Sequence, residues 1–209
     1  MDQEHRNKRL RLLVAKLNRE RKKQAKKIDI LCNDLIAAQR EFIKSLDATS
    51  FAASFYESIV GITDLTTLLY TADKLIQEEI PDANVVFFLR QSESFELHMF
   101  ETDRPVILER QELKSCFIWE LADNICKSNR ICTLADMFGM GLEGNPAKLN
   151  KISGAAVPLG QFGSSVGFIF IYRSSQNELT VDELRAVTAV RCGLSRAIQS
   201  CRVLSHSAD

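Results

Sequence analysis

Residues 152–173, ISGAAVPLGQFGSSVGFIFIYR, decide the fold class of this chain. They contain two apolar segments, Ile152–Leu159 and Ser164–Arg173, that are typical of β-strands, and only Gly160-Gln161-Phe162-Gly163 joins them. A connection of four residues is too short for a crossover helix, so the two strands must run antiparallel. The stretch therefore predicts a β-hairpin.

A second hairpin and several helices surround this pair of strands. Val85–Arg90 and Phe95–Phe100 flank Gln91-Ser92-Glu93-Ser94, a polar connection that also suits a hairpin. The other predicted elements are a helix at Leu65–Ile80 after the N-cap Asp64, a helix at Cys116–Lys127 capped by Ser115, a short strand at Arg130–Leu134, and a helix that starts from a capping box of Thr180 and Glu183. This order predicts an α+β fold: an antiparallel central sheet with the terminal helices bundled on one face, plus a long N-terminal helix.

The N-terminal helix is predicted over His5–Ser45, where neither Pro nor Gly occurs, and a further helix over Ser50–Val60 before Gly61. A heptad frame places apolar residues at positions a and d at both ends of the long helix and polar residues in its middle. The C-terminal helix has a similar pattern. We therefore expect a homodimer whose interface includes Leu10, Val14, Leu17, Ile28, Leu31, Leu35, Val187 and Leu194. The alternative is that the apolar stripe packs on the domain that follows it.

The formal net charge of zero is the sum of two oppositely charged parts. Residues 1–27 hold eleven Lys and Arg but only three acidic residues, which gives +8, so the rest of the chain carries −8. This asymmetry gives a first domain boundary, after a basic N-terminal helix that we place at 1–46; a tail is expected at 204–209. We expect the basic run at residues 19–27 to be a solvated helix face; nucleic acid is a less favoured partner because aromatic residues are not interleaved with the charges. An anionic membrane surface or an acidic partner is a further alternative.

Several protein classes are disfavoured by composition. No uninterrupted apolar stretch reaches the ~18 residues of a membrane span, and the N-terminus lacks the apolar core of a secretory signal. The six cysteines show no C-x-x-C pair, which argues against a disulfide framework and a zinc knuckle. We therefore expect a cytoplasmic protein without a transmembrane segment or a metal site.

Three motifs in the C-terminal half resemble those of GAF domains. They are Gly154-Ala155-Ala156-Val157-Pro158-Leu159, Val166-Gly167-Phe168-Ile169-Phe170 and Leu179-Thr180-Val181-Asp182-Glu183-Leu184. The resemblance covers about residues 50–203 and implies a sensory domain that holds its ligand on the sheet face opposite the terminal helices. It also implies dimers, commonly parallel, formed through those helices.

The resemblance does not carry the known chemistries of the family onto this chain. Bilin-binding members attach the chromophore to a Cys that is often followed by His, but Phe117 follows Cys116 here and Lys127 follows Cys126. The pattern of cyclic-nucleotide-binding members is incomplete, since Leu179 fills its aromatic position. The free methionine-sulfoxide reductases need reactive Cys residues in the loop at 136–150, which contains none.

The long segment Asp136–Asn150 is predicted to be irregular and to cover the sheet together with the helix at 116–127, so a pocket is expected between them. Its Gly139-Met140-Gly141-Leu142-Glu143-Gly144 has the spacing of a dinucleotide loop but no crossover helix follows, and we expect a flexible lid. The candidate ligand-binding residues are Phe88, His98, Phe117, Trp119, Asp136 and Phe170. For His98, Trp119 and Asp136 a purely structural role is the alternative.

No nucleophile stands in a known motif beside a base, so the sequence gives no reason to expect an enzyme or a catalytic residue. The hypothesis is a small-molecule-sensing or regulatory domain that dimerises through its terminal helices and signals to a separate partner protein. The alternative is a ligand-free dimerisation or protein-interaction module. The sequence names neither the ligand nor a cofactor.

Overall fold

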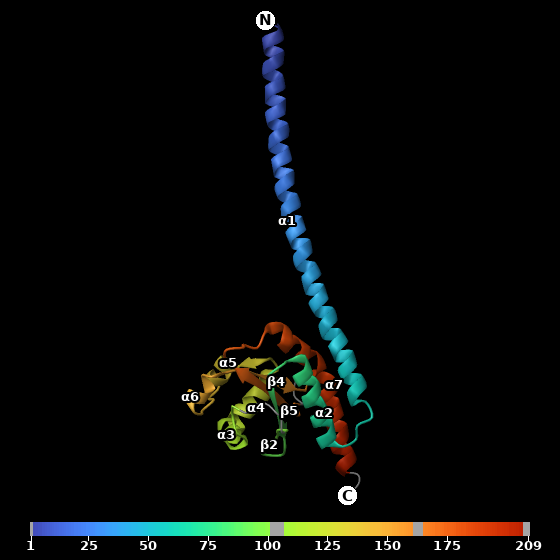
Figure 1. Ribbon diagram of the computed structural model, residues 1–209, viewed down its shortest axis with the longest axis vertical. Helices are drawn as coiled ribbons and strands as arrows, with labels where there is room; N and C mark the ends of the chain where they lie inside the picture. The colour runs from blue at the N-terminus through green and yellow to red at the C-terminus, as the bar shows by residue number, and fades with distance from the viewer. Residues whose placement is uncertain (1, 101–106, 161–164, 207–209) are drawn as a thin grey trace. The chain divides into compact units, whose positions relative to one another are not determined.

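A computed structural model describes residues 2–100, 107–160 and 165–206 (Figure 1). The chain divides into two compact units, Met1–Leu46 and Asp47–Asp209. Most of the predicted hairpin connection, residues 161–163, and the last three residues of the predicted tail, 207–209, lie outside the described residues.

Helix α1 runs without interruption from Asp2 to Ile59. The prediction of a separate helix at Ser50–Val60 was therefore wrong, because residues 46–49 contain no Gly or Pro that would end the first helix. The helix ends before Gly61, which has φ 84°. In the first unit, every residue from 3 to 46 is exposed.

The second unit is built around a five-stranded sheet in the order β2-β1-β5-β4-β3, with every pair antiparallel. Its strands are β1 (Asn84–Arg90), β2 (Phe95–His98), β3 (Cys132–Thr133), β4 (Ile152–Leu159) and β5 (Gly167–Ser174). The two predicted hairpins are β1–β2 and β4–β5, and β5 also pairs with β1. This arrangement confirms the predicted α+β fold with an antiparallel central sheet.

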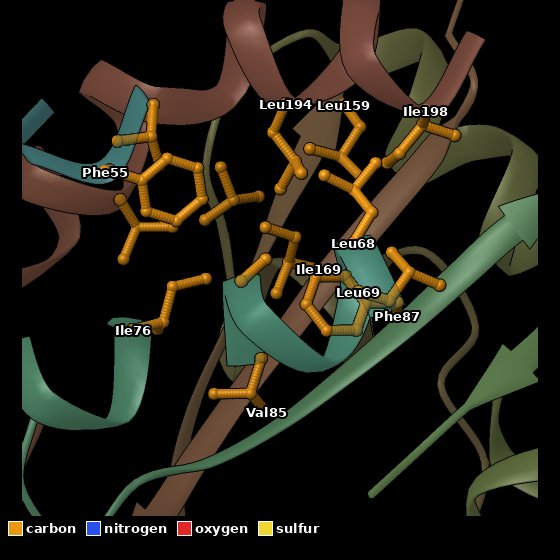
Figure 2. Packing of buried hydrophobic residues seen from close by; sticks show 14 of the residues in the cluster. Phe55, Leu68, Leu69, Ile76, Val85, Phe87, Leu159, Ile169, Leu194 and Ile198 are labelled. Carbon is orange, nitrogen blue, oxygen red and sulfur yellow. The ribbon is translucent and has the colours of Figure 1, made fainter. Parts of the chain in front are cut away.

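One face of the sheet is covered by α2 (Leu65–Glu79), α7 (Val181–His206) and residues 51–59 of α1. Side chains of these helices meet alternate residues of the strands, such as Phe87 of β1 and Ile169 of β5 (Figure 2). The helix ends agree with the predicted caps: Asp64 accepts a hydrogen bond from the Thr67 backbone N–H, and Thr180 forms the capping box with Glu183. We call this the helical-bundle face.

The opposite face is covered by α3 (Arg110–Cys116), α4 (Trp119–Ser128), α5 (Leu134–Gly139) and α6 (Pro146–Leu149). The helix predicted at Cys116–Lys127 is α4, which begins only at Trp119 because Ile118 has the extended ψ of 163°; Cys116 ends α3, a helix that the sequence did not predict. Ser115 does not cap either helix, because its hydroxyl donates to the Glu112 carbonyl within α3. We call this side of the sheet the aromatic face.

The segment predicted to be irregular, Asp136–Asn150, contains most of α5 and all of α6. Asn145 caps α6, and Pro146 occupies its first turn, where the missing N–H costs nothing. Gly139 and Gly144 belong to this partly helical segment, and Gly144 packs close to Cys116 of α3. The prediction of a wholly irregular loop was therefore wrong.

Candidate functional site

An open hollow of about 210 Å³ lies on the aromatic face, where the β1–β2 hairpin meets the junction of α3 and α4. Three of the predicted ligand-binding residues line it: Phe88, Phe117 and Trp119. The other lining residues are Glu93, Ser94, Phe95, Leu97, Lys114 and Ile118. The lining is thus mostly aromatic and aliphatic, with one cationic and one anionic side chain.

Stacked rings occupy the space beneath this hollow. Phe88 lies 4.7 Å from Phe168 and 4.8 Å from Phe117, between ring centroids, and Phe117 lies 4.9 Å from Phe170. Phe170 stacks in turn on Tyr172. Since Phe168, Phe170 and Tyr172 are fully buried, the sheet side of the aromatic face is packed with rings and the hollow is confined to their outer edge.

The guanidinium of Arg90 lies beside two aromatic rings at the rim of the hollow. The Arg90 guanidinium lies 5.3 Å from the Trp119 ring centroid and 5.4 Å from that of Phe95, and the two rings are 5.1 Å apart. Arg90 also donates to the carboxylate of Asp123 on α4. The Asp123 carboxylate pairs with Lys127 at 2.6 Å, and hydrogen bonds from Lys127 and Arg90 hold the pKa of Asp123 below its ordinary value.

His98 does not belong to this hollow. It pairs with Phe87 across β1 and β2, so both side chains point to the helical-bundle face, whereas Phe88 and Leu97 point to the aromatic face. Its Nε2 lies 3.4 Å from a carboxylate oxygen of Glu96. Burial lowers the pKa of His98, more than the attraction of Glu96 raises it. The predicted ligand role of His98 at this pocket is therefore wrong.

Asp136 is likewise part of the local structure. Its carboxylate accepts hydrogen bonds from the Thr133 backbone N–H at 2.9 Å and the Thr133 hydroxyl at 2.8 Å, which starts α5. Arg130 also pairs with it at 3.0 Å. These bonds, first among them the one from the Thr133 backbone, lower the pKa of Asp136. The capping alternative is therefore the correct one, and Phe170 reaches the site only through its contact with Phe117.

The predicted dimer residues fall into two groups. Those of α1 are exposed, for example Leu17 at 72% and Leu35 at 69%. Val187 and Leu194 of α7 are 0% exposed, because their helix face packs on α2 and the sheet within the same subunit. The heptad pattern of α7 thus describes core packing, and assigning these two residues to a dimer interface was wrong.

A second hollow, of about 300 Å³, lies near the far ends of β1 and β5 and is lined in part by Asn84, Arg173 and Asn177. The Arg173 guanidinium is committed within the chain: it donates to the carbonyls of Asn177 and Glu178 and to the carboxylate of Glu183. It therefore acts as a structural tie, and we take the aromatic hollow as the candidate site.

Arg90, Phe95 and Phe168 also belong to the site, although none of them was predicted from the sequence. The alternation of aromatic residues at 168, 170 and 172 with aliphatic residues at 169 and 171 could have identified Phe168, since period-two side chains share a face. Arg90 at the end of β1 gave no comparable signal. Within residues 2–100, 107–160 and 165–206, no cluster of His, Cys, Asp and Glu could hold a metal ion.

Four of the six cysteines are buried in the globular unit. Cys116, Cys126, Cys132 and Cys201 are buried, and burial raises the pKa of each thiol. No helix in the described part of the chain combines the length and apolarity that a bilayer crossing requires.

The globular unit is similar to solved GAF domains. The GAF domain of a phosphoenolpyruvate-protein phosphotransferase from Coxiella burnetii matches with a TM-score of 0.58 and 13% identity over 77% of this chain and 98% of that chain. The GAF domain/HD domain protein from Geobacter sulfurreducens matches with 0.53 and 15% identity over 69% and 98%. Free methionine-R-sulfoxide reductase from Neisseria meningitidis, solved with its substrate, matches with 0.53 and 15% identity over 75% and 91%.

No protein-family model matches the chain, and no curated protein matches its sequence. The structural matches nevertheless confirm the predicted GAF-like fold. Because their sequence identities are this low, they establish the fold and leave the chemistry of the site to be argued from its own residues.

Proposed function

We propose that this chain is a regulatory GAF-like module that binds a small molecule at the aromatic hollow, dimerises through its N-terminal helix and signals to a separate partner protein in the cytoplasm. The observation that carries the ligand role is that Phe88, Phe117 and Trp119, from β1 and the α3–α4 junction, line one open hollow. Such a lining suits a small, flat, mostly apolar molecule whose polar groups meet Lys114 or Ser94.

Arg90 supplies a route from this hollow to the terminal helices. Its guanidinium lies over Trp119 at the rim, while its backbone carbonyl accepts a hydrogen bond from Arg202 of α7 at 3.0 Å. A ligand that moves the Trp119 ring changes the position that Arg90 prefers, and so biases the contact with α7. The difference in the ligand's binding free energy between the two positions of Arg90 would set how strongly binding changes the contact with α7.

The dimerisation part rests on the apolar stripe of α1. Leu10, Val14 and Leu17 before the polar middle of the seam, and Ile28 and Leu31 after it, occupy heptad positions a and d, and each is at least half exposed. An exposed stripe of this length is typical of a coiled-coil seam without its partner.

We propose a non-catalytic role. The thiols in the globular unit that stand nearest the aromatic face, Cys116, Cys126 and Cys132, are buried and their raised pKa values keep them protonated. A thiol reductase needs an accessible thiolate, so this arrangement does not favour the chemistry of the sulfoxide reductase that shares the fold.

Trp119 provides a specific test, because it is the only tryptophan in the chain. Its fluorescence should shift or be quenched when the purified full chain is titrated with members of a panel of small planar carboxylic acids and heteroaromatic compounds. Native mass spectrometry of the same protein should show the bound compound as an added mass.

A matched pair of substitutions controls this experiment. Ile118→Phe adds a ring at the mouth of the hollow and should weaken binding at least tenfold, whereas Val181→Phe adds the same ring at an exposed site on α7 and should not. If no compound changes Trp119 fluorescence, or if both variants bind equally, the ligand role fails.

The second candidate is a ligand-free dimerisation or protein-interaction module. It is favoured by the ring packing of Phe88, Phe117, Phe168 and Phe170, which already fills the space under the hollow. A protein that forms a dimer but whose Trp119 fluorescence no compound changes would support this candidate. Sedimentation of the full chain beside a chain lacking residues 1–46 measures the dimer.

A further inference from the structure

From residue 10 to residue 35, the apolar and polar core residues of the α1 seam follow in the same order from either end. If residues are counted outward from the point between Lys22 and Lys23, each heptad a residue on one side meets a d residue on the other at equal distance. The matched pairs are Arg21 with Gln24, Leu17 with Ile28, Val14 with Leu31, Leu10 with Leu35, Asn7 with Ala38, and Gln3 with Phe42. The three pairs next to the central one join large exposed apolar residues, and the central pair is polar on both sides.

We propose that the N-terminal helices of two copies pair antiparallel, in a register centred between Lys22 and Lys23 of each. This inference rests on the proposed dimerisation and adds its direction and register. When the second helix runs the opposite way, each a residue faces a d residue of the partner, so the six matched pairs above become the layers of the seam. The paired region, residues 3–42, lies wholly inside the unit Met1–Leu46.

The charge in the middle of the seam favours this direction. A parallel dimer in register would place Arg21 against the partner's Arg21 at a core a position, where two guanidinium groups repel and are partly desolvated. The antiparallel register places Arg21 against the partner's Gln24, whose side-chain carbonyl can accept a hydrogen bond from the guanidinium.

The charges that flank the seam favour it as well. In the antiparallel register the g positions of the two helices are neighbours, so that Glu20 meets the partner's Lys27 and Arg6 meets the partner's Glu41, each twice by symmetry. In a parallel dimer g residues meet e residues of the next heptad, and Arg6 would meet the partner's Arg11. The antiparallel dimer thus gains four opposite-charge contacts and avoids both like-charge arrangements.

Cross-linking tests the direction. The antiparallel register makes Arg11 and the partner's Cys32 neighbours at e positions, and Cys32 is the exposed thiol of α1. In the full chain, Arg11→Cys should therefore give, on mild oxidation, a disulfide between peptides containing residues 11 and 32, identified by mass spectrometry. The same variant with Cys32→Ser should not form this link.

A spin-label distance gives a second measurement that does not depend on oxidation. Lys8→Cys in a Cys32→Ser, Cys192→Ser background carries the label at the same site in both copies. At 1.5 Å per residue, the antiparallel register separates the two labels by about 43 Å, because residue 8 of one helix lies level with residue 37 of the other. A parallel dimer brings them within about 20 Å, roughly the width of two helices.

Charge reversal tests the register. Lys27→Glu places like charges at two symmetric contacts and should weaken the dimer about tenfold in sedimentation equilibrium at low salt, and the double variant Glu20→Lys, Lys27→Glu should restore it. Lys26→Glu makes the same charge change at an f position away from the seam and should alter the dissociation constant by less than about twofold.

The outcomes separate the two proposals. A chain that remains monomeric at every concentration overturns the proposed dimerisation itself. A dimer that gives the short label distance and no 11–32 link, and in which Lys27→Glu behaves like Lys26→Glu, overturns only the antiparallel register.

Discussion

Gly167, the first residue of β5, passes so close to Phe88 of β1 that no side chain fits between the two strands. A Cβ at Gly167 would clash with the Phe88 carbonyl oxygen and lie 2.9 Å from the Cα of Leu89. Gly167 also has φ 147°, which an L residue with a side chain rarely adopts. The strand that carries Phe168 and Phe170 can therefore begin here only with glycine.

Gly167→Ala should for this reason destabilise the domain by about 3 kcal/mol or more, since it combines backbone strain with a steric clash. Gly154→Ala in β4 is the matched control. Its Cβ would meet the Phe170 ring at 3.1 Å, and its φ is not in the left-handed region, so the cost should be smaller. Urea unfolding followed by circular dichroism compares the two, and equal losses would contradict the role given to Gly167.

His98 should make the stability of the domain depend on pH. Burial lowers its pKa below the ordinary 6.5, so the unfolded chain binds a proton that the folded chain does not. The free energy of unfolding should therefore fall as the pH is lowered from 6.5 through the folded pKa. Glu96 opposes this shift, while Arg110 and Arg202 add to it. In His98→Gln the dependence should shrink; an unchanged curve from pH 7 to 5 would assign it to other groups.

The bidentate pair of Arg173 and Glu183 should be a major contribution to stability. Arg173 is only 4% exposed and donates to the two carboxylate oxygens at 2.8 and 2.9 Å, which joins β5 to α7. Arg173→Met leaves Glu183 without this partner and should cost about 3 kcal/mol. Arg185→Met breaks an exposed pair with Asp182 on the same helix and should cost less than about 0.5 kcal/mol. Chemical denaturation of both variants decides whether the difference exists.

At low pH, protonation of Glu183 should remove the stabilisation that its pair with Arg173 provides. Burial alone would raise its pKa, but hydrogen bonds from Thr180 and Arg173 outweigh burial and hold the pKa below the ordinary 4.5. The stabilisation is then complete above pH 4.5 and is lost as the pH falls through the folded pKa. Measured between pH 6 and 3, the stability difference between the native protein and Arg173→Met should narrow at the acid end; a constant difference would argue against the pair.

The thiols should react in an order set by their environment. Cys32 is exposed and should react rapidly with a thiol-specific reagent at pH 8, followed by the partly exposed Cys192. The four buried thiols, whose pKa values burial raises, should react only on unfolding. Counting modified sites by mass spectrometry over time tests this, and early modification of Cys126 would mean that the region around α4 opens readily.

Most of the fold could be predicted because its signals are local. The alternation within residues 152–173, the Asp64 cap and the Thr180–Glu183 capping box each depend on neighbours in sequence. The errors had two sources. The unbroken α1 and the capping box of Thr133 with Asp136 are local features that were missed beside the glycines that follow them. The break at Ile118 follows Phe117, whose ring contacts with Phe88 and Phe168 join positions far apart in the sequence.

The candidate site was predictable only in part. Phe88, Phe117 and Trp119 stood out as aromatic residues near an expected pocket, and the structure brings them together. His98 was wrongly placed in the site because a shift of one residue in strand register moves a side chain to the other face of the sheet. The register of β2 depends on its pairing with β1, which the sequence does not show. Arg90 was missed because its contacts with Trp119 and Asp123 join positions about thirty residues apart.

The two faces of β5 also protect the fold against mispairing. Its rings at 168, 170 and 172 and its branched aliphatic chains at 169 and 171 belong to two separate hydrophobic clusters, one on each face of the sheet. A slip of one residue in β5 would turn its rings toward the helical bundle, where they do not fit, and would leave voids on the aromatic face. A slip of one residue in β5 would therefore cost free energy twice, once for excess volume among the helices and once for the voids left on the aromatic face.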